Sequence, residues 1–89
     1  MKTLVLQSAP KEKLFCVALI PPGSNLAEHW RTHLPAYCIY DFDPAFSSDY
    51  GHIRFGDGSW LHLSQESLTE LVLLPELDED QMDQLGLFV

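Results

Sequence analysis

The chain is poor in positive charge. Its 89 residues include five Lys and Arg against 13 Asp and Glu, which gives a formal net charge of -8 at pH 7. A surface of that sign repels the phosphates of nucleic acids and the anionic headgroups of lipids. We therefore expect no direct binding of nucleic acid and no binding to a membrane surface.

The chain also lacks a long apolar run. The longest one, residues 14–22, is much shorter than the roughly 20 apolar residues that a membrane-spanning helix needs. Near the start, the apolar residues 4–6 are followed at once by Gln7, which leaves too short a stretch for the apolar region of a secretory signal. We expect a cytoplasmic chain without a membrane span.

Cysteine is scarce too. The sequence has two, Cys16 and Cys38, and both lie in strongly apolar segments that are typical of strands. Thiols in such segments are usually buried and reduced. A reactive thiol would need a partly exposed, electropositive setting. We therefore predict neither a disulfide nor catalysis by a cysteine.

The apolar content that is present suits one core. With 46% hydrophobic residues over 89 positions, the chain has the size and composition of a single domain spanning residues 1–89. A chain of this length buries roughly 60 to 65% of its unfolded surface. We expect it to fold without a metal or a disulfide.

Four segments have the pattern of strands. Residues 3–8 alternate weakly, residues 13–20 form a continuous apolar run typical of a central strand, and residues 36–42 are aromatic and β-branched. Residues 68–74 fit a strand or a helix by periodicity. We favour a strand there, because Pro75 closes the segment after seven residues.

One helix is predicted between the second and third of these strands. Asn25, followed three residues later by Glu28, resembles a capping box, and the helix is expected to end before Pro35. At 100° per residue, its apolar side carries Leu26, Ala27, Trp30, His33 and Leu34. The pattern predicts a short amphipathic helix packed on a sheet.

A β-hairpin is the clearest local signal. Asp57 and Gly58 form the residue pair of a two-residue type I′ turn, flanked by residues 51–55 and 59–63. His52 and His62 then lie on opposite faces of the hairpin. The predicted cross-strand pairs are Phe55 with Trp60, Arg54 with Leu61, Ile53 with His62 and His52 with Leu63.

The last predicted element is a short acidic helix. Asp78 can cap it, the acids of its first turn suit the positive end of the helix dipole, and Gly86 follows its end near Gln84. Together these elements predict an α+β fold. We expect an antiparallel sheet of about five to six strands, one amphipathic helix after the second strand, and the acidic helix at the end.

Few residue patterns point to catalysis. His29 and His33 are four residues apart on the predicted helix and could hold a metal together, with a third ligand from Asp41, Asp43, His52 or His62. The simpler interpretation is a pair of histidines at a helix edge, because Trp30 stands where zinc-protease helices have a glutamate. No nucleotide-binding or nucleophile motif occurs. We predict no catalytic residue, no metal and no cofactor.

The least generic feature is acidic charge near the end of the chain. Residues 55–89 hold eight acids and no Lys or Arg, whereas residues 1–54 hold five of each. Carboxylates speed association with a basic partner, and exposed aromatic side chains supply the anchoring contacts. The predicted partner-binding residues are Glu76, Asp78, Glu79, Asp80, Asp83, Tyr50 and Trp60.

These observations favour a non-enzymatic binding module. We predict a small acidic inhibitor or regulator that occludes the basic, nucleic-acid-binding surface of a partner protein, as phage and mobile-element inhibitors of nucleases do. That analogy rests on size and charge alone. One alternative is an assembly subunit of a homodimer or hetero-oligomer, joined through an edge strand and the apolar residues 85–89. Another is a metal-dependent enzyme using His29 and His33.

Overall fold

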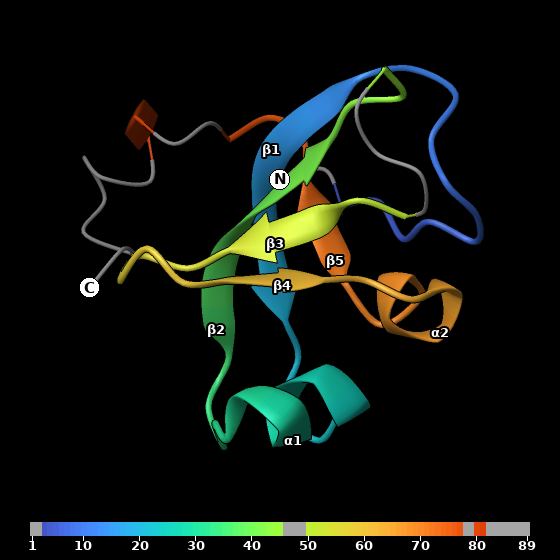
Figure 1. Ribbon diagram of the computed structural model, residues 1–89. Helices are drawn as coiled ribbons and strands as arrows, with labels where there is room; N and C mark the ends of the chain where they lie inside the picture. Colours follow the sequence, from blue (N-terminus) through green and yellow to red (C-terminus); the bar gives the residue numbers. More distant parts are fainter. Residues whose placement is uncertain (1–2, 46–49, 78–79, 82–89) are drawn as a thin grey trace.

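The computed structural model describes residues 3–45, 50–77 and 80–81. Within them the chain forms a five-stranded antiparallel sheet with two short helices (Figure 1), which confirms the α+β class. The sheet order is β4-β3-β2-β1-β5. Along the chain, the elements are β1 (Leu14–Ile20), α1 (Asn25–Trp30), β2 (Ala36–Phe42), β3 (His52–Arg54), β4 (Trp60–His62), α2 (Gln65–Leu68) and β5 (Val72–Leu74).

The long strands β1 and β2 form the middle of the sheet. They pair over their whole length, from Leu14 opposite Phe42 to Ile20 opposite Ala36. The other side of β1 pairs with β5, so β1 is a central strand as predicted. A full strand over residues 3–8 does not form: Leu4 alone bridges to Leu73, beside β5. The predicted amphipathic helix therefore follows the first strand rather than the second.

The chain around residues 64–74 combines a helix and a strand. Residues 65–68 form α2, because the Ser64 hydroxyl caps it by accepting a hydrogen bond from the Ser67 backbone N–H at 3.2 Å. The strand predicted for residues 68–74 is confirmed in its last three residues, which form β5. Leu68 instead ends α2, where its side chain is buried in the core.

Alternation along the strands gives the sheet a covered face and an open face. We call the face that packs under α1 and α2 the covered face. Its core contains Cys16, Ala18, Ile20, Leu26, Ala27, Cys38, Tyr40, Phe42, Ile53, Phe55, Leu63, Leu68, Leu71 and Leu73. Among the described residues no polar or charged side chain is buried. The opposite face, which we call the open face, has a smaller buried cluster of Val17, Ile39 and Leu74 on β1, β2 and β5, and its side chains on β3 and β4 are more exposed. Among the described residues, α1 and α2 supply core residues to the covered face and none to the cluster on the open face.

Helix α1 is shorter than its sequence pattern predicts. Its N-cap is Ser24, whose hydroxyl accepts the Ala27 backbone N–H at 3.0 Å, rather than Asn25. The helix ends at Trp30, because Arg31 adopts the left-handed conformation with φ 60 and closes a Schellman motif. The prediction that His33 and Leu34 lie on its packed side is wrong: both follow the helix and are exposed.

The hairpin is present, but its loop and register differ from the prediction. Gly58 has φ 89 and Asp57 has no positive φ, so the turn is not type I′. The backbone N–H of Phe55 donates to Ser59 O and that of Gly58 donates to Phe55 O, which closes a three-residue loop. The added loop residue shifts the register by one position. The observed pairs are His52 with His62, Ile53 with Leu61 and Arg54 with Trp60.

The corrected register gives Phe55 a different aromatic partner. Phe55 does not face Trp60; its ring stacks on Trp30 of α1, with centroids 3.6 Å apart and an interplanar angle of 4°. Rings this close and nearly parallel are stacked face to face, so the contact stabilises mainly through the apolar area that it buries. The hairpin is thereby fixed against α1 on the covered face.

Two further predictions concern the acidic helix near the end of the chain and the absence of a membrane-spanning helix. Of the predicted acidic helix over residues 78–84, only Asp80 and Gln81 are described, so that prediction lies outside the described residues. Over the parts of the chain that are described, no helix is long and apolar enough to cross a membrane.

Candidate functional site

The open face carries a cluster of polar and aromatic side chains on β3 and β4. Backbone hydrogen bonds join Phe55 to Ser59 and Leu63 to Gly51. Because bonded and non-bonded pairs alternate in an antiparallel ladder, His52–His62 and Arg54–Trp60 are non-hydrogen-bonded pairs. Side chains approach most closely in such pairs. The register therefore brings these four side chains together on one face.

These four residues, His52, Arg54, Trp60 and His62, form what we call the histidine–tryptophan patch. The ring centroids of His52 and His62 are 6.0 Å apart. Trp60 meets both rings edge-on, at 4.7 Å from His62 and 5.9 Å from His52. The four side chains line an open hollow of about 200 Å³. Trp60 is 57% exposed, which is unusual for a large aromatic residue and typical of contact surfaces.

Side chains of β1 and β2 extend the patch across the open face. The Asp41 carboxylate lies 3.6 Å from Nε2 of His52, on the neighbouring strand. The Arg54 guanidinium lies over the ring of Phe15, 5.8 Å from its centroid, within range of a cation–π contact. Phe15 is 42% exposed. Around β3 and β4, the open face thus presents aromatic rings and imidazoles, with the Asp41 carboxylate beside His52.

Strand β4 is an edge of the sheet. Because Leu61 is in a hydrogen-bonded pair with Ile53, its backbone groups face β3, and those of Trp60 and His62 face outward. Within the described part of the chain, no residue pairs with that outer side. The histidine–tryptophan patch therefore lies directly beside a row of backbone donors and acceptors.

The predicted partner-binding residues do not form one cluster. Trp60 lies on edge strand β4, while Glu76 follows β5 at the opposite edge, four strand spacings or about 19 Å away. Glu76 and Asp80 are exposed. Tyr50 is half-buried against the covered-face core, and its hydroxyl lies 3.4 Å from Oε1 of Gln65. The other predicted residues, Asp78, Glu79 and Asp83, lie outside the described residues.

The histidine pair predicted from the helix pattern does not share a helix. His29 belongs to α1 but His33 follows its end, and both are exposed. The conclusion that His52 and His62 cannot share one face is also wrong, because they are direct cross-strand partners. Even so, in the portions of the chain that are described, no three or more His, Cys, Asp or Glu side chains are arranged to hold a metal ion.

Both thiols lie in the covered-face core, as predicted. Cys16 and Cys38 are free and buried. Burial raises the pKa of Cys16 to about 11 and that of Cys38 to about 12, because a thiolate would lose its hydration there. These thiols are protonated near neutral pH and are poor nucleophiles. Their contribution is to packing.

Tyr40 fixes the start of β3 from the same core. Its hydroxyl donates a 2.7 Å hydrogen bond to the Tyr50 backbone carbonyl, and burial raises its pKa to about 12. Gly51, next along the chain, has φ 90, and a Cβ there would come within 2.8 Å of the Asp41 carbonyl oxygen. This close approach places His52 directly opposite Asp41.

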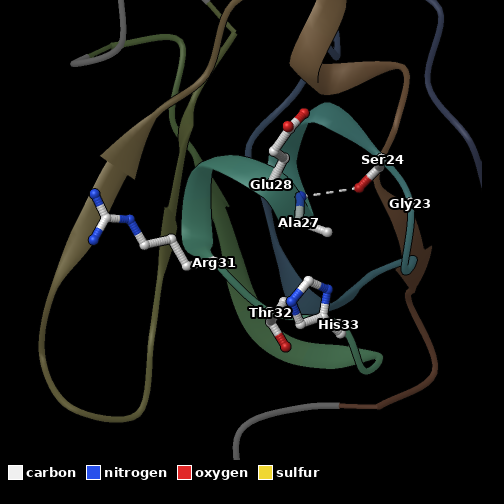
Figure 2. A pocket seen from close by; sticks show the side chains of 7 residues that line it. All are labelled: Gly23, Ser24, Ala27, Glu28, Arg31, Thr32 and His33. Carbon is white, nitrogen blue, oxygen red and sulfur yellow. Dashed lines mark hydrogen bonds between the residues drawn. The ribbon is translucent and has the colours of Figure 1, made fainter.

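A larger hollow, of about 380 Å³, lies beside α1 (Figure 2). It is lined by Gly23, Ser24, Ala27, Glu28, Arg31, Thr32 and His33. In Figure 2 the Ser24 hydroxyl is engaged by the Ala27 N–H, while Glu28 and Arg31 point in different directions. Ligand sites need polar groups that converge on one point. This hollow is a weaker candidate than the histidine–tryptophan patch.

Sequence reasoning missed His52, His62 and Arg54 as members of a common patch. The signal was the loop Gly56-Asp57-Gly58, which allows a three-residue loop with glycine in its left-handed position. The Asp57 carboxylate accepts hydrogen bonds from the Ser59 backbone at 2.9 Å and hydroxyl at 2.6 Å, and thereby supports that loop. In comparisons with family models, characterised proteins and solved structures, nothing was found to match the chain.

Proposed function

We propose that the chain is a non-enzymatic protein-binding module that docks its carboxylates on a basic surface of a partner protein. The observation that carries the proposal is the exposure of acids in the part of the chain after Arg54, which has no Lys or Arg. The exposed acids described there are Asp57, Glu66, Glu76 and Asp80. Their charge faces water rather than an internal cation.

One acid of this region, Glu70, has a structural role and so differs from the exposed acids. Glu70 binds α1 with both carboxylate oxygens, accepting from Nδ2 of Asn25 at 2.9 Å and from the Leu26 backbone N–H at 3.1 Å. Its carboxylate satisfies a donor at the start of α1. Glu76 and Asp80 make no comparable contact to α1, so they remain the better candidates for a partner.

The kind of partner that we propose follows from the chemistry of exposed carboxylates. A basic cleft that binds nucleic acid is built to neutralise a series of negative charges. A protein surface with many exposed carboxylates competes for the same Lys and Arg side chains and speeds its own association through long-range attraction. We infer that the module inhibits or regulates such a partner by occluding its nucleic-acid-binding surface.

The proposal is tested by capturing partners from the native host at low and high salt, followed by mass spectrometry. The variant Glu76→Gln/Asp78→Asn/Glu79→Gln/Asp80→Asn should weaken binding to the captured partner by about tenfold at low ionic strength, with a smaller difference at high salt. Thermal unfolding should be nearly unchanged.

A matched pair of double variants separates local from bulk charge. Glu76→Gln/Asp80→Asn and Glu12→Gln/Glu28→Gln remove the same charge from exposed sites, the first pair near the end of the chain and the second in its first third. The first should weaken binding more than the second. Equal effects, or unchanged affinity in the quadruple variant, would contradict docking through the acidic region.

A further inference from the structure

The outer edge of β4 has the features of a strand-addition site. Trp60 and His62 direct their backbone N–H and C=O groups away from β3, and no described residue pairs with them. We propose that this edge binds an extended acidic segment of a partner protein, which adds as a sixth strand and places its carboxylates over the histidine–tryptophan patch. Main-chain hydrogen bonds supply affinity in this binding mode, and alternate side chains supply specificity.

The register dictates which side chains of the added strand meet the patch. Residues of the added strand that pair with Trp60 and His62 point to the open face, as Trp60 and His62 themselves do. The residue between them faces the covered side, next to Leu61, whose side chain packs against that core. The site therefore favours an apolar residue flanked by two residues that suit the patch.

The side chains of the patch favour acidic residues at those two flanking positions. Arg54, His52 and His62 can each donate to a carboxylate, and the hollow that they line with Trp60 is open beside the edge. Of the described acids, Asp41 lies beside the patch, 3.6 Å from His52 on the side away from β4. A lysine on the added strand would instead meet the guanidinium of Arg54.

The chain's own β4 is a poor occupant of this edge. Its residues Trp60, Leu61 and His62 contain no carboxylate. A second copy paired edge to edge would therefore set imidazole against imidazole or indole, with no acid opposite Arg54. Charge complementarity selects an acidic segment from another protein.

This site is separate from the docking surface proposed above. It lies at the edge opposite β5 and Glu76, and it takes a partner segment of the opposite charge. Either proposal can fail without the other. The two tests are also distinct, because acid-to-amide variants near the end of the chain leave β4 unchanged.

The test uses two labelled peptides with blocked ends. One has a Glu–Val–Glu core and the other a Lys–Val–Lys core, each flanked by threonines. Fluorescence anisotropy measures affinity, and amide shifts in ¹H–¹⁵N spectra locate the site. We expect the acidic peptide to bind at least about tenfold more tightly than the basic one, with the largest shifts in β3 and β4.

Variants at His62 and Arg54 separate the backbone and charge contributions. His62→Pro removes the imidazole together with an outward N–H that the β3–β4 ladder does not use, a change that edge strands tolerate, and should weaken the acidic peptide by about tenfold. His62→Ala removes the imidazole alone and should weaken it less, so the difference between the two variants gives the backbone contribution. Arg54→Glu keeps the backbone and should reverse the preference to the basic peptide. His29→Ala, at an exposed histidine of α1, should change nothing.

Several results would overturn the proposal. They are equal binding of the two peptides, no binding of the acidic one, full affinity in both His62→Pro and Arg54→Glu, or shifts confined to another surface. A mass that rises with protein concentration and returns to that of the monomer in His62→Pro would assign the edge to a second copy and would also refute it.

Discussion

The two faces of the sheet are formed by the same strands but carry different kinds of side chains. On β3, Ile53 points to the covered face and is fully buried, while its neighbours His52 and Arg54 point to the open face beside Trp60. Helices cover the first face with apolar side chains, whereas the second presents rings and charges at the β4 edge. The larger buried cluster lies on the covered face, whereas on the open face Val17, Ile39 and Leu74 are buried and the exposed side chains lie mainly on β3 and β4.

The two edges of the sheet differ in a related way. The outer side of β5 is closed in part by Leu4, which exchanges two backbone hydrogen bonds of 2.9 and 2.7 Å with Leu73. The outer side of β4 has no such partner among the described residues. Proteins usually cover or shorten such edges to avoid unwanted pairing. Both edge strands are short, and they differ in that β5 is partly covered by Leu4, so β4 is the edge to which we assign strand addition.

The largest expected effect tests the covered face. Ile53→Ala should lower the free energy of unfolding by about 2–5 kcal/mol, because the side chain is fully buried in the main core and leaves a cavity. Arg54→Ala, one residue along the same strand but exposed, should cost less than about 1 kcal/mol. Urea denaturation measures both.

The comparison between these neighbours is its own control, because both variants truncate a side chain on the same short strand. If Arg54→Ala lowered the free energy of unfolding as much as Ile53→Ala does, the proposed difference between the two faces would be contradicted. That result would mean that the contact between Arg54 and Phe15 contributes to folding as much as core packing does.

A second effect, of intermediate size, is a loss of stability in alkali. The thiols of Cys16 and Cys38 have pKa values near 11 and 12 in the folded chain, above their ordinary value of 9. Between the ordinary pKa and the pKa in the folded chain, the unfolded chain releases thiol protons that the folded chain retains. Stability therefore falls as pH rises through that range. Each thiol lowers the free energy of unfolding by up to about 1.4 kcal/mol per pH unit there.

Thermal melts between pH 8 and 10 measure this slope. Tyr40, whose pKa is raised to about 12, adds to it only above its ordinary value of 10. The variant Cys16→Ala/Cys38→Ala should be less stable at pH 8 but should have a shallower slope up to pH 10. An unchanged slope in this variant would mean that the buried thiols do not cause the alkaline loss.

The sequence predicts the middle of this fold well. Strands β1 and β2 were placed within one residue of their observed starts, because each is an apolar run bounded by polar residues or proline and so does not depend on distant contacts. Burial of both thiols follows from the same runs. Helix α2 was missed because four residues are too few to show a helical period, although Ser64 is a suitable N-cap.

The candidate site was harder to predict because its composition depends on one loop residue. A side-chain period of two means that a shift of one position moves every side chain of a strand to the other face. With a two-residue loop, His62 would face Ile53; with the observed loop it faces His52. The end of α1 had a similar ambiguity, since Arg31 adopts a left-handed conformation that is more typical of glycine.

The smallest expected effect tests this loop directly. Gly58 has φ 89, and a Cβ there meets no atom within 4 Å, so the cost of Gly58→Val is conformational. We expect a loss of about 1–2 kcal/mol in the free energy of unfolding, because β-branched residues disfavour positive φ. Gly58→Asn should cost less, since asparagine tolerates that conformation.

Gly56→Ala is the matched control, because Gly56 does not have positive φ, and it should cost less than Gly58→Val. Urea denaturation gives the stabilities, and nuclear Overhauser contacts between His52 and His62 report the register. Equal losses at the two glycines would contradict the three-residue loop. Loss of the His52–His62 contact in Gly58→Val, with the fold retained, would show that this loop alone determines which histidines the open face presents.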